Sequence, residues 1–342
     1  MEEYDFNNYE DYNAENITED ENATVELVTG HQTHRSPLTD TLLVLNGAIC
    51  LLGLVGNGLV IWIAGFRMRR TVTTTWYLSL AVSDFLFCAW LPFSMVVMAR
   101  VHWPLGVAMC KLTSSVLFLN MFSSIFLLVL ISADRCTVVV FPVWAQNHRT
   151  VQKAVIAIAL AWIASAMLSA PSLAFRQVKG QGNSTQCYTS YRSLSTQRTV
   201  ALSRFVAGFA IPLLLIVTCY SLILVRICSL QTARISRPIR IASVLVTVFF
   251  ACWLPHHIFM FLEIEHQQHS LALLTAGQEV GATLAVAHSF LNPVLYVLMG
   301  KNFQKKLRQR PLLLRRMEYA MGEDGNAASR SLSMDAKASC QV

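Results

Sequence analysis

The uncharged stretch 112–133, LTSSVLFLNMFSSIFLLVLISA, lies between Lys111 and the adjacent charges Asp134 and Arg135. At about 1.5 Å of rise per residue, a helix from Lys111 to Asp134 is roughly 34 Å long, which matches a hydrocarbon layer of about 30 Å. The stretch therefore predicts a transmembrane helix with a charge at each face of the membrane. Because charges are costly in hydrocarbon, the Asp-Arg pair is expected either to anchor the helix at the interface or to take part in function.

Apolar stretches of similar length recur along the 342-residue chain, in which 54% of residues are hydrophobic and only 14% are charged. This composition excludes an ordinary soluble domain. The stretches near or above the roughly 20 residues of a spanning helix lie at 41–66, 73–99, 112–133, 153–175, 205–225, 241–262 and 280–299. The predicted fold is an all-α membrane protein with a seven-transmembrane helix bundle.

Lys and Arg are concentrated in the connections after the first, third and fifth stretches and in the segment after the seventh. The positive-inside rule therefore places the N-terminus outside the cell and the C-terminus in the cytosol. The first 40 residues are polar and show no cleavable signal peptide, so the first helix is expected to act as the insertion signal. The expected location is the plasma membrane, as a multi-pass protein.

The composition divides the chain into four parts. Residues 1–40 are predicted to form an extracellular, acidic, disordered arm, since half of the 20 Asp and Glu residues lie in 1–26, which has no Lys or Arg. This arm is either a solvated leader or an attractant for a basic protein ligand. Residues 41–300 form the seven-helix domain, 301–316 a basic amphipathic helix on the inner leaflet, and 317–342 a cytosolic tail with serines suited to phosphorylation.

Covalent features on the outer side support this topology. Asn16, Asn22 and Asn183 begin glycosylation sequons, and all of them fall on the side assigned as external. Cys110 and Cys187 are the cysteines that face the oxidising side, so we expect them to form a disulfide that tethers the loop after the fourth helix.

Polar residues inside the predicted bundle form a second pattern. Asp84 lies in the middle of the second helix without a basic neighbour in sequence, so it needs a cation, a proton or a dense shell of hydrogen bonds. Asn120 and Ser124 share one face of the third helix, and His288 and Asn292 share one face of the seventh. Such oxygen ligands suit Na⁺, and the alternative is a structural polar network.

Proline marks the sixth helix. Pro255 follows Trp253 by two residues and should kink the helix, and Phe249 lies on the same face as Trp253. The kink is either a hinge or a static bend. Pro212 and Pro293 predict further kinks in the fifth and seventh helices.

Several motifs stand in register with these helices: GNGLVIW at 56–62, LAVSD at 80–84, SADRC at 132–136, Trp162, Pro212 with Tyr220, CWLP at 252–255 and NPVLY at 292–296. Together they resemble the rhodopsin-like G-protein-coupled receptors. PVWAQNHRTV at 142–151 is similar to the chemoattractant branch, which includes chemerin receptors, formyl peptide receptors and the second prostaglandin D2 receptor.

The resemblance implies roles for named residues. Asp134 would hold Arg135 at rest, and the released arginine would help to seat a G protein, expected to be of the inhibitory class. Tyr220 and Tyr296 would move inward at the same end. The resemblance further implies arrestin as a partner, no enzymatic activity and no nucleic-acid partner. The activation switch would comprise Phe249, Trp253, Pro255, Asn292 and Pro293, and an allosteric Na⁺ would be held by Asp84, Asn120 and Ser124.

Departures from the family pattern qualify two of these roles. The usual Asp-Arg-Tyr triplet is Asp-Arg-Cys here, and no acid stands near Ile235, so we expect a weak lock on Arg135 and measurable basal signalling. His288 replaces the usual asparagine beside the sodium site, where an imidazole either donates a hydrogen bond or competes with Na⁺ as a cation.

Basic residues on the outer side indicate the ligand. Arg204 and Arg176 match cations that capture a carboxylate in this branch, and Phe118 and His256 complete the expected ligand-binding set. The alternative for Arg204 is snorkelling to the outer interface. The expected ligand is a chemerin-like protein or a peptide with a free carboxylate. The alternatives are an acidic lipid such as prostaglandin D2, a formyl peptide, or a non-signalling scavenger role.

Other classes of membrane protein lack support. The chain shows no internal repeat of the kind that transporters carry. No lysine lies in 277–300, where an opsin would bind retinal, and no intramembrane protease signature is present.

Overall fold

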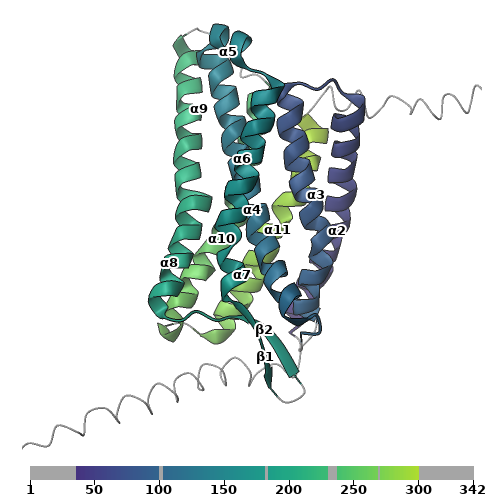
Figure 1. Cartoon of the computed structure of the whole chain (residues 1–342), viewed down its shortest axis with the longest axis vertical. Coiled ribbons are helices and arrows are strands. Elements are labelled where there is room, and N and C mark those ends of the chain that lie inside the picture. Colours follow the sequence, from purple (N-terminus) through teal and green to yellow (C-terminus); the bar gives the residue numbers. More distant parts are fainter. Residues whose placement is uncertain (1–35, 100–102, 182–183, 230–236, 269, 300–342) are drawn as a thin grey trace, which may run out of the picture.

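The computed structural model describes residues 36–99, 103–181, 184–229, 237–268 and 270–299, which form a bundle of long helices (Figure 1). Ser36 caps the first helix, so residues 37–40 are helical and do not belong to the predicted arm. The remainder of that arm, the predicted helix 301–316 and the tail 317–342 lie outside the described residues. The sequons at Asn16, Asn22 and Asn183 also lie outside them.

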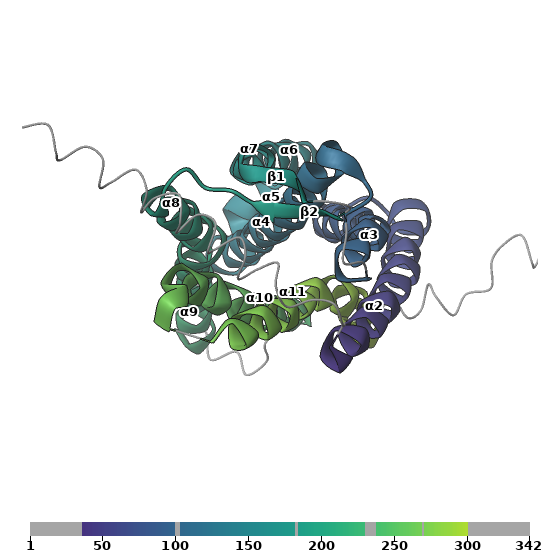
Figure 2. The same ribbon diagram turned by 90° about the horizontal axis from the view of Figure 1, so that it is seen from below.

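The long helices follow the apolar stretches but extend beyond them. Six helical segments within the described ranges are long and apolar enough to cross a membrane: Pro37–Arg67, Val72–Val96, Gly106–Val140, Val151–Phe175, Leu194–Ser229 and Pro238–Glu265. A further helix, α11 (Leu271–Met299), packs against both α10 (Arg237–Leu262) and α2 (Pro37–Trp62). It closes the bundle between the sixth and first spans (Figure 2).

The other helices complete the bundle and its connections. The third span is a single helix, whereas a short helix on the cytosolic side links it to the fourth span. The elements are η1 (Ile63–Arg67), α3 (Val72–Ala99), α4 (Gly106–Val140), α5 (Pro142–His148), α6 (Val151–Ser169), α7 (Pro171–Phe175), α8 (Leu194–Phe205), η2 (Val206–Ala210), α9 (Ile211–Ser229) and η3 (Glu263–Gln268).

The fifth span differs most from its sequence prediction, which started it at residue 205. The helix begins at Leu194, where the Ser193 hydroxyl accepts a hydrogen bond from the Thr196 amide at 3.2 Å. The segment 194–204 is polar, so its hydropathy hides a helix that its cap and its packing stabilise. Arg204 consequently stands well inside a helix and not at its outer end.

The three prolines on which the predicted kinks rest all lie within long helical spans. Pro255 and Pro293 lie inside α10 and α11, and the fifth span carries the π-helical segment η2 just before Pro212. A π-bulge inserts an extra residue into a turn and so changes which face the residues on either side present. Because η2 lies between α8 and α9, the direction in which Arg204 points does not follow from the direction of the residues in α9 by regular helical spacing.

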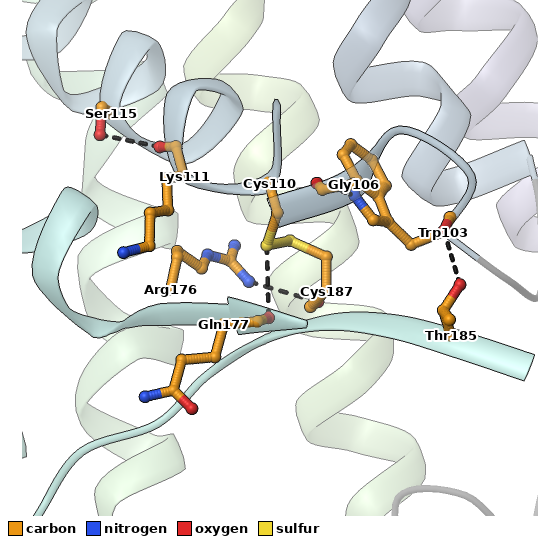
Figure 3. Close-up of a disulfide and its surroundings, with 9 residues drawn as sticks. All are labelled: Trp103, Gly106, Cys110, Lys111, Ser115, Arg176, Gln177, Thr185 and Cys187. Carbon is orange, nitrogen blue, oxygen red and sulfur yellow. Dashed lines mark hydrogen bonds between the residues drawn. A yellow bond between two sulfur atoms is a disulfide. The ribbon is translucent and has the colours of Figure 1, made fainter. Parts of the chain in front are cut away.

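A two-stranded hairpin covers the outer end of the bundle, opposite α5 (Figure 1). Strands β1 (Arg176–Gln181) and β2 (Ser184–Thr189) pair antiparallel, with Val178 opposite Cys187. The predicted disulfide is present between Cys110 of α4 and Cys187 of β2, with a Cα–Cα distance of 5.7 Å (Figure 3). Thr185 of β2 donates its hydroxyl hydrogen to the Trp103 carbonyl at 2.6 Å, a second tie to the start of α4.

The core lies along α4. Phe122, Ile125 and Leu128 of this helix are buried in one apolar cluster with Phe249 and Trp253 of α10. Apolar side chains on the outer faces of the helices, such as Val55, Leu160 and Val225, are exposed, as expected for surfaces that contact lipid. The fold therefore holds α4 at the centre, with its charged cytosolic end and its outer end both in contact with other helices.

Candidate functional site

Arg204 faces the interior of the bundle near its outer end. The residue is 8% exposed, its Nη2 donates to the Ser172 hydroxyl at 2.9 Å, and its Cζ lies 3.6 Å from the centroid of the Phe118 ring. The snorkelling alternative is therefore wrong, because the guanidinium packs between α4 and α7 and not at the membrane surface. Contact with an aromatic ring stabilises a buried cation only in part.

Arg176 directly follows α7 and is the first residue of β1 (Figure 3). Its Nη1 donates to the Cys187 carbonyl at 3.5 Å, which places it beside the disulfide. Burial lowers the pKa of the Arg176 guanidinium, while the charges of Tyr191 and Glu263 oppose that shift. The disulfide and the hairpin thus position Arg176 over the outer end of the bundle.

Neither arginine forms an ion pair with a carboxylate in the part of the chain that the structure describes, although the charge of Glu263 acts on Arg176 at longer range. Their polar contacts are neutral: the Ser172 hydroxyl, the Cys187 carbonyl and the Tyr191 phenol. No described carboxylate forms an ion pair with either arginine, and the Nε atoms of both are buried without a hydrogen-bond partner. Because a buried cation is costly unless it is paired, this arrangement suits an anionic ligand.

A row of aromatic rings leads from Arg204 into the core. The centroid of Phe118 is 6.1 Å from that of His256, which is 5.6 Å from Trp253, which in turn is 5.9 Å from Phe249. The predicted ligand residues Phe118 and His256 are therefore in line with the predicted switch residues. A ligand that moves the Phe118 ring would act on Trp253 through one intervening side chain.

His257 was missed in the sequence analysis. It is buried, both of its ring nitrogens lack a hydrogen-bond partner among the described residues, and it packs edge-on against Phe205 and Phe209. The doubled histidine in LPHHIF is the signal that could have found it, since ionisable side chains within a membrane span usually face the interior of the bundle and not the lipid.

Asp84 lies at the centre of the bundle with 0% exposure. Its carboxylate accepts hydrogen bonds from Asn292 Nδ2 at 2.6 Å, Asn120 Nδ2 at 3.3 Å and Ser124 Oγ at 3.5 Å. The three residues come from α11 and α4, as the sequence predicted. No lysine or arginine of the described ranges is paired with this carboxylate.

The donor set around Asp84 fits Na⁺. Carboxylate and hydroxyl oxygens are hard ligands, and a buried carboxylate without a lysine or arginine partner is a site where a monovalent cation would supply the missing charge. His288 is the departure from the family pattern: its Nε2 lies 3.7 Å from Asp84 Oδ1, and its Nδ1 is 2.5 Å from the Ala285 carbonyl. The imidazole is therefore turned toward the same carboxylate.

The opposite end of α4 carries the predicted Asp134–Arg135 pair, which is present. Both side chains are buried, and the structure adds a second partner for Asp134, Arg149. Arg149 donates from Nε to Asp134 Oδ1 at 2.5 Å and from Nη2 to Asp134 Oδ2 at 2.9 Å. Thr73 Oγ1 accepts from the Nη2 atoms of both arginines, each at 2.9 Å.

The tyrosines predicted at this end are only partly described. Tyr220 packs against a small apolar cluster formed by Cys136, Ile223 and Ile239. The side chain of Tyr296 lies outside the described residues. Asn292 and Pro293 are both buried, Asn292 at the carboxylate of Asp84.

Comparison with known proteins agrees with this geometry. Residues 56–296 match the family model described as 7 transmembrane receptor (rhodopsin family). The chain belongs to the rhodopsin-like receptors. It is 35% identical over 343 residues to the pig protein named chemerin-like receptor 1, with 94% of each chain covered.

Two further relatives are of the same type. The human chemerin-like receptor 1 is 38% identical over 308 residues, covering 84% of this chain and 82% of the relative. The rainbow trout (Oncorhynchus mykiss) C3a anaphylatoxin chemotactic receptor is 41% identical over 293 residues, covering 83% and 80%. This rhodopsin-like receptor is thus of the chemoattractant type, a multi-pass plasma-membrane protein that takes extracellular ligands and couples to G proteins, and it is not an enzyme.

Proposed function

We propose that this receptor responds to a chemoattractant protein or peptide that presents a free C-terminal carboxylate, as a chemerin-like ligand would. The observation that carries the proposal is the pair of outer arginines, of which Arg204 is buried and Arg176 is half-buried. The Nε atom of each is buried without a hydrogen-bond partner, and neither arginine forms an ion pair with a described carboxylate. A carboxylate can accept two hydrogen bonds from one guanidinium, which supplies both charge and direction.

The carboxylate would bind near Arg204, above the Phe118 ring, with Arg176 closing the site from the hairpin. The row of rings from Phe118 through His256 to Trp253 then links ligand binding to α10, whose Pro255 lies two residues beyond Trp253. Movement of α10 would release the cytosolic end for a G protein, for which we propose the inhibitory class, and for arrestin after phosphorylation of the tail.

The test uses matched ligands and matched variants. Cells that express the receptor are treated with chemerin C-terminal peptide as the free acid and as the C-terminal amide, and inhibition of forskolin-raised cAMP is measured with and without pertussis toxin. The free acid should be the more potent form at the wild-type receptor. Arg204→Gln should remove this difference, whereas Arg198→Gln, which changes an exposed arginine of the same helix, should retain it.

Other outcomes identify the alternatives. A response to prostaglandin D2 that survives deletion of residues 2–26 would indicate an acidic lipid ligand, and a response to formyl peptide would indicate that class. Arrestin recruitment without any cAMP response would indicate a scavenger. Equal potency of the acid and the amide at the wild-type receptor would contradict carboxylate recognition by Arg204.

We also propose that Asp84, Asn120 and Ser124 hold an allosteric Na⁺ when the receptor is at rest. The buried carboxylate and the hard oxygen donors support this proposal, and His288 is the side chain that would compete for the same carboxylate.

A further inference from the structure

Asp134 is bound more completely by Arg149 than by its sequence neighbour Arg135. Arg149 makes a bidentate contact, with Nε on Oδ1 and Nη2 on Oδ2, whereas Arg135 reaches only Oδ2, through Nη2. Bidentate pairing is the stronger and more directional form of an arginine–carboxylate contact. The acid therefore has a complete partner even before Arg135 is counted.

Arg149 takes its position without help from Arg135. It ends the short helix α5, where its backbone N–H donates to the Ala145 carbonyl at 3.1 Å, and it precedes Thr150, whose hydroxyl caps α6. Its side chain is 25% exposed, compared with 7% for Asp134. The local backbone thus fixes the position from which the Arg149 side chain extends, and the two hydrogen bonds that it makes to Asp134 do not involve Arg135.

Arg135 is held incompletely. Its Nη2 shares both of its acceptors, Asp134 Oδ2 and Thr73 Oγ1, with the Nη2 of Arg149. Its Nε is buried without a partner among the described residues. Two like charges on one acid also repel each other. Arg135 therefore loses little when it turns toward a new acceptor.

We propose that Arg149 is a positioning residue for G-protein coupling: it keeps Asp134 paired when Arg135 leaves, and so favours the coupled state. If Arg149 were absent, release of Arg135 would leave a buried, unpaired carboxylate, which is strongly unfavourable. The inference goes beyond the proposed function, since it concerns the cytosolic end and does not depend on which ligand binds outside.

The test is direct binding of a G protein, without agonist, to purified receptor in lipid nanodiscs. The nucleotide-free heterotrimer of the class that binds the wild-type receptor is titrated, and the apparent Kd is measured. Because only the released conformation binds, the apparent Kd rises as that conformation becomes rarer. Arg149→Gln should raise the Kd about fivefold or more, the lower end of the range for coupled sites. Lys153→Gln, which removes an exposed charge nearby on α6, should leave it unchanged.

A second background separates positioning from direct contact. In Asp134→Asn there is no acid charge to keep paired, so adding Arg149→Gln should change the Kd less than about twofold, as expected when the two residues act through one interaction. A fivefold rise in the apparent Kd in both backgrounds would mean that Arg149 contacts the G protein itself, and would overturn the proposal. An unchanged or lower Kd for Arg149→Gln alone would overturn it too.

Fluorescence-detected size exclusion shows whether Arg149→Gln folds. If it does not, Arg149→Lys is measured in its place. A lysine keeps the charge but cannot make the bidentate contact, so the Kd should fall between those of the wild type and the expected glutamine variant. A Kd for Arg149→Lys that equals the wild-type value would show that bidentate pairing is not required, and would contradict this assignment.

Discussion

Buried or half-buried arginines stand at both ends of this receptor, but they differ in what neutralises them. At the cytosolic end, Arg135 and Arg149 share the carboxylate of Asp134 and the hydroxyl of Thr73. At the outer end, Arg204 and Arg176 contact only neutral groups among the described residues, and Arg204 lies over the ring of Phe118.

A cation that is paired with an anion inside the protein and a cation that lacks such an anion can serve different purposes. A cation paired within the protein can act as a switch, because its pairing can be exchanged for another. A buried cation that lacks an anion leaves part of its desolvation penalty unrecovered, and a ligand carboxylate can recover it. The outer end therefore favours an anionic ligand. The cytosolic end instead exchanges the partners of its arginines.

The largest expected effect comes from giving the outer arginines an acid of their own. Phe118→Asp places a carboxylate beside Arg204, so the affinity for a free-acid ligand should fall by about 100-fold, within the range for losing a buried charge pair. The control is Phe118→Asn, because asparagine has the size of aspartate but no charge. Competition binding measures both variants. If the two lose affinity equally, the charge of Arg204 is not what the ligand requires.

Removal of the acid at the cytosolic end should have the next largest effect. Asp134→Asn takes away the shared anion and leaves Arg135 without its resting partner, so agonist-independent GTPγS binding should rise by about fivefold to tenfold. Membranes matched for receptor number provide the comparison. Unchanged basal exchange would show that the Asp134 pair does not restrain Arg135.

Arg176 should contribute less than Arg204, because its guanidinium also contacts the Cys187 carbonyl and belongs to the hairpin and not to the helices. Arg176→Gln should weaken a free-acid agonist by about fivefold, as expected for one hydrogen bond of ordinary net strength. The dose–response curves of the acid and amide forms measure the loss. A greater loss than Arg204→Gln produces would reverse the assigned order of the two arginines.

The smallest effect is expected between the two ends, at Asp84. Replacing Na⁺ with choline in the buffer should raise agonist affinity by roughly threefold, because an ion that favours the resting state opposes an agonist that favours the other state. Asp84→Asn should abolish the salt effect. Radioligand competition at constant ionic strength is the measurement, and an unchanged salt effect in the variant would exclude Asp84 as the ligand of the ion.

The sequence alone predicts the bundle, the disulfide and the placement of Asp84, because long apolar stretches, topology and isolated charges are properties of single segments. It placed the start of the fifth helix eleven positions too late, at 205 instead of Leu194, because polar helical residues carry no hydropathy signal. It also left open whether Arg204 snorkels or faces inward. The position of one residue in a helix does not say which neighbour its side chain will contact.

The amino-acid sequence is enough to define the segments that must leave water, the orientation of the chain, and the residue types that accompany the family motifs. These follow from local composition and from the charge of the connections. Only the tertiary structure decided which charges meet. Arg149 reaches Asp134 from the end of α5, and Phe118 of α4 lies under Arg204 of α8. Such pairings join residues far apart in the chain, and they depend on helix rotation and packing, which no single segment encodes.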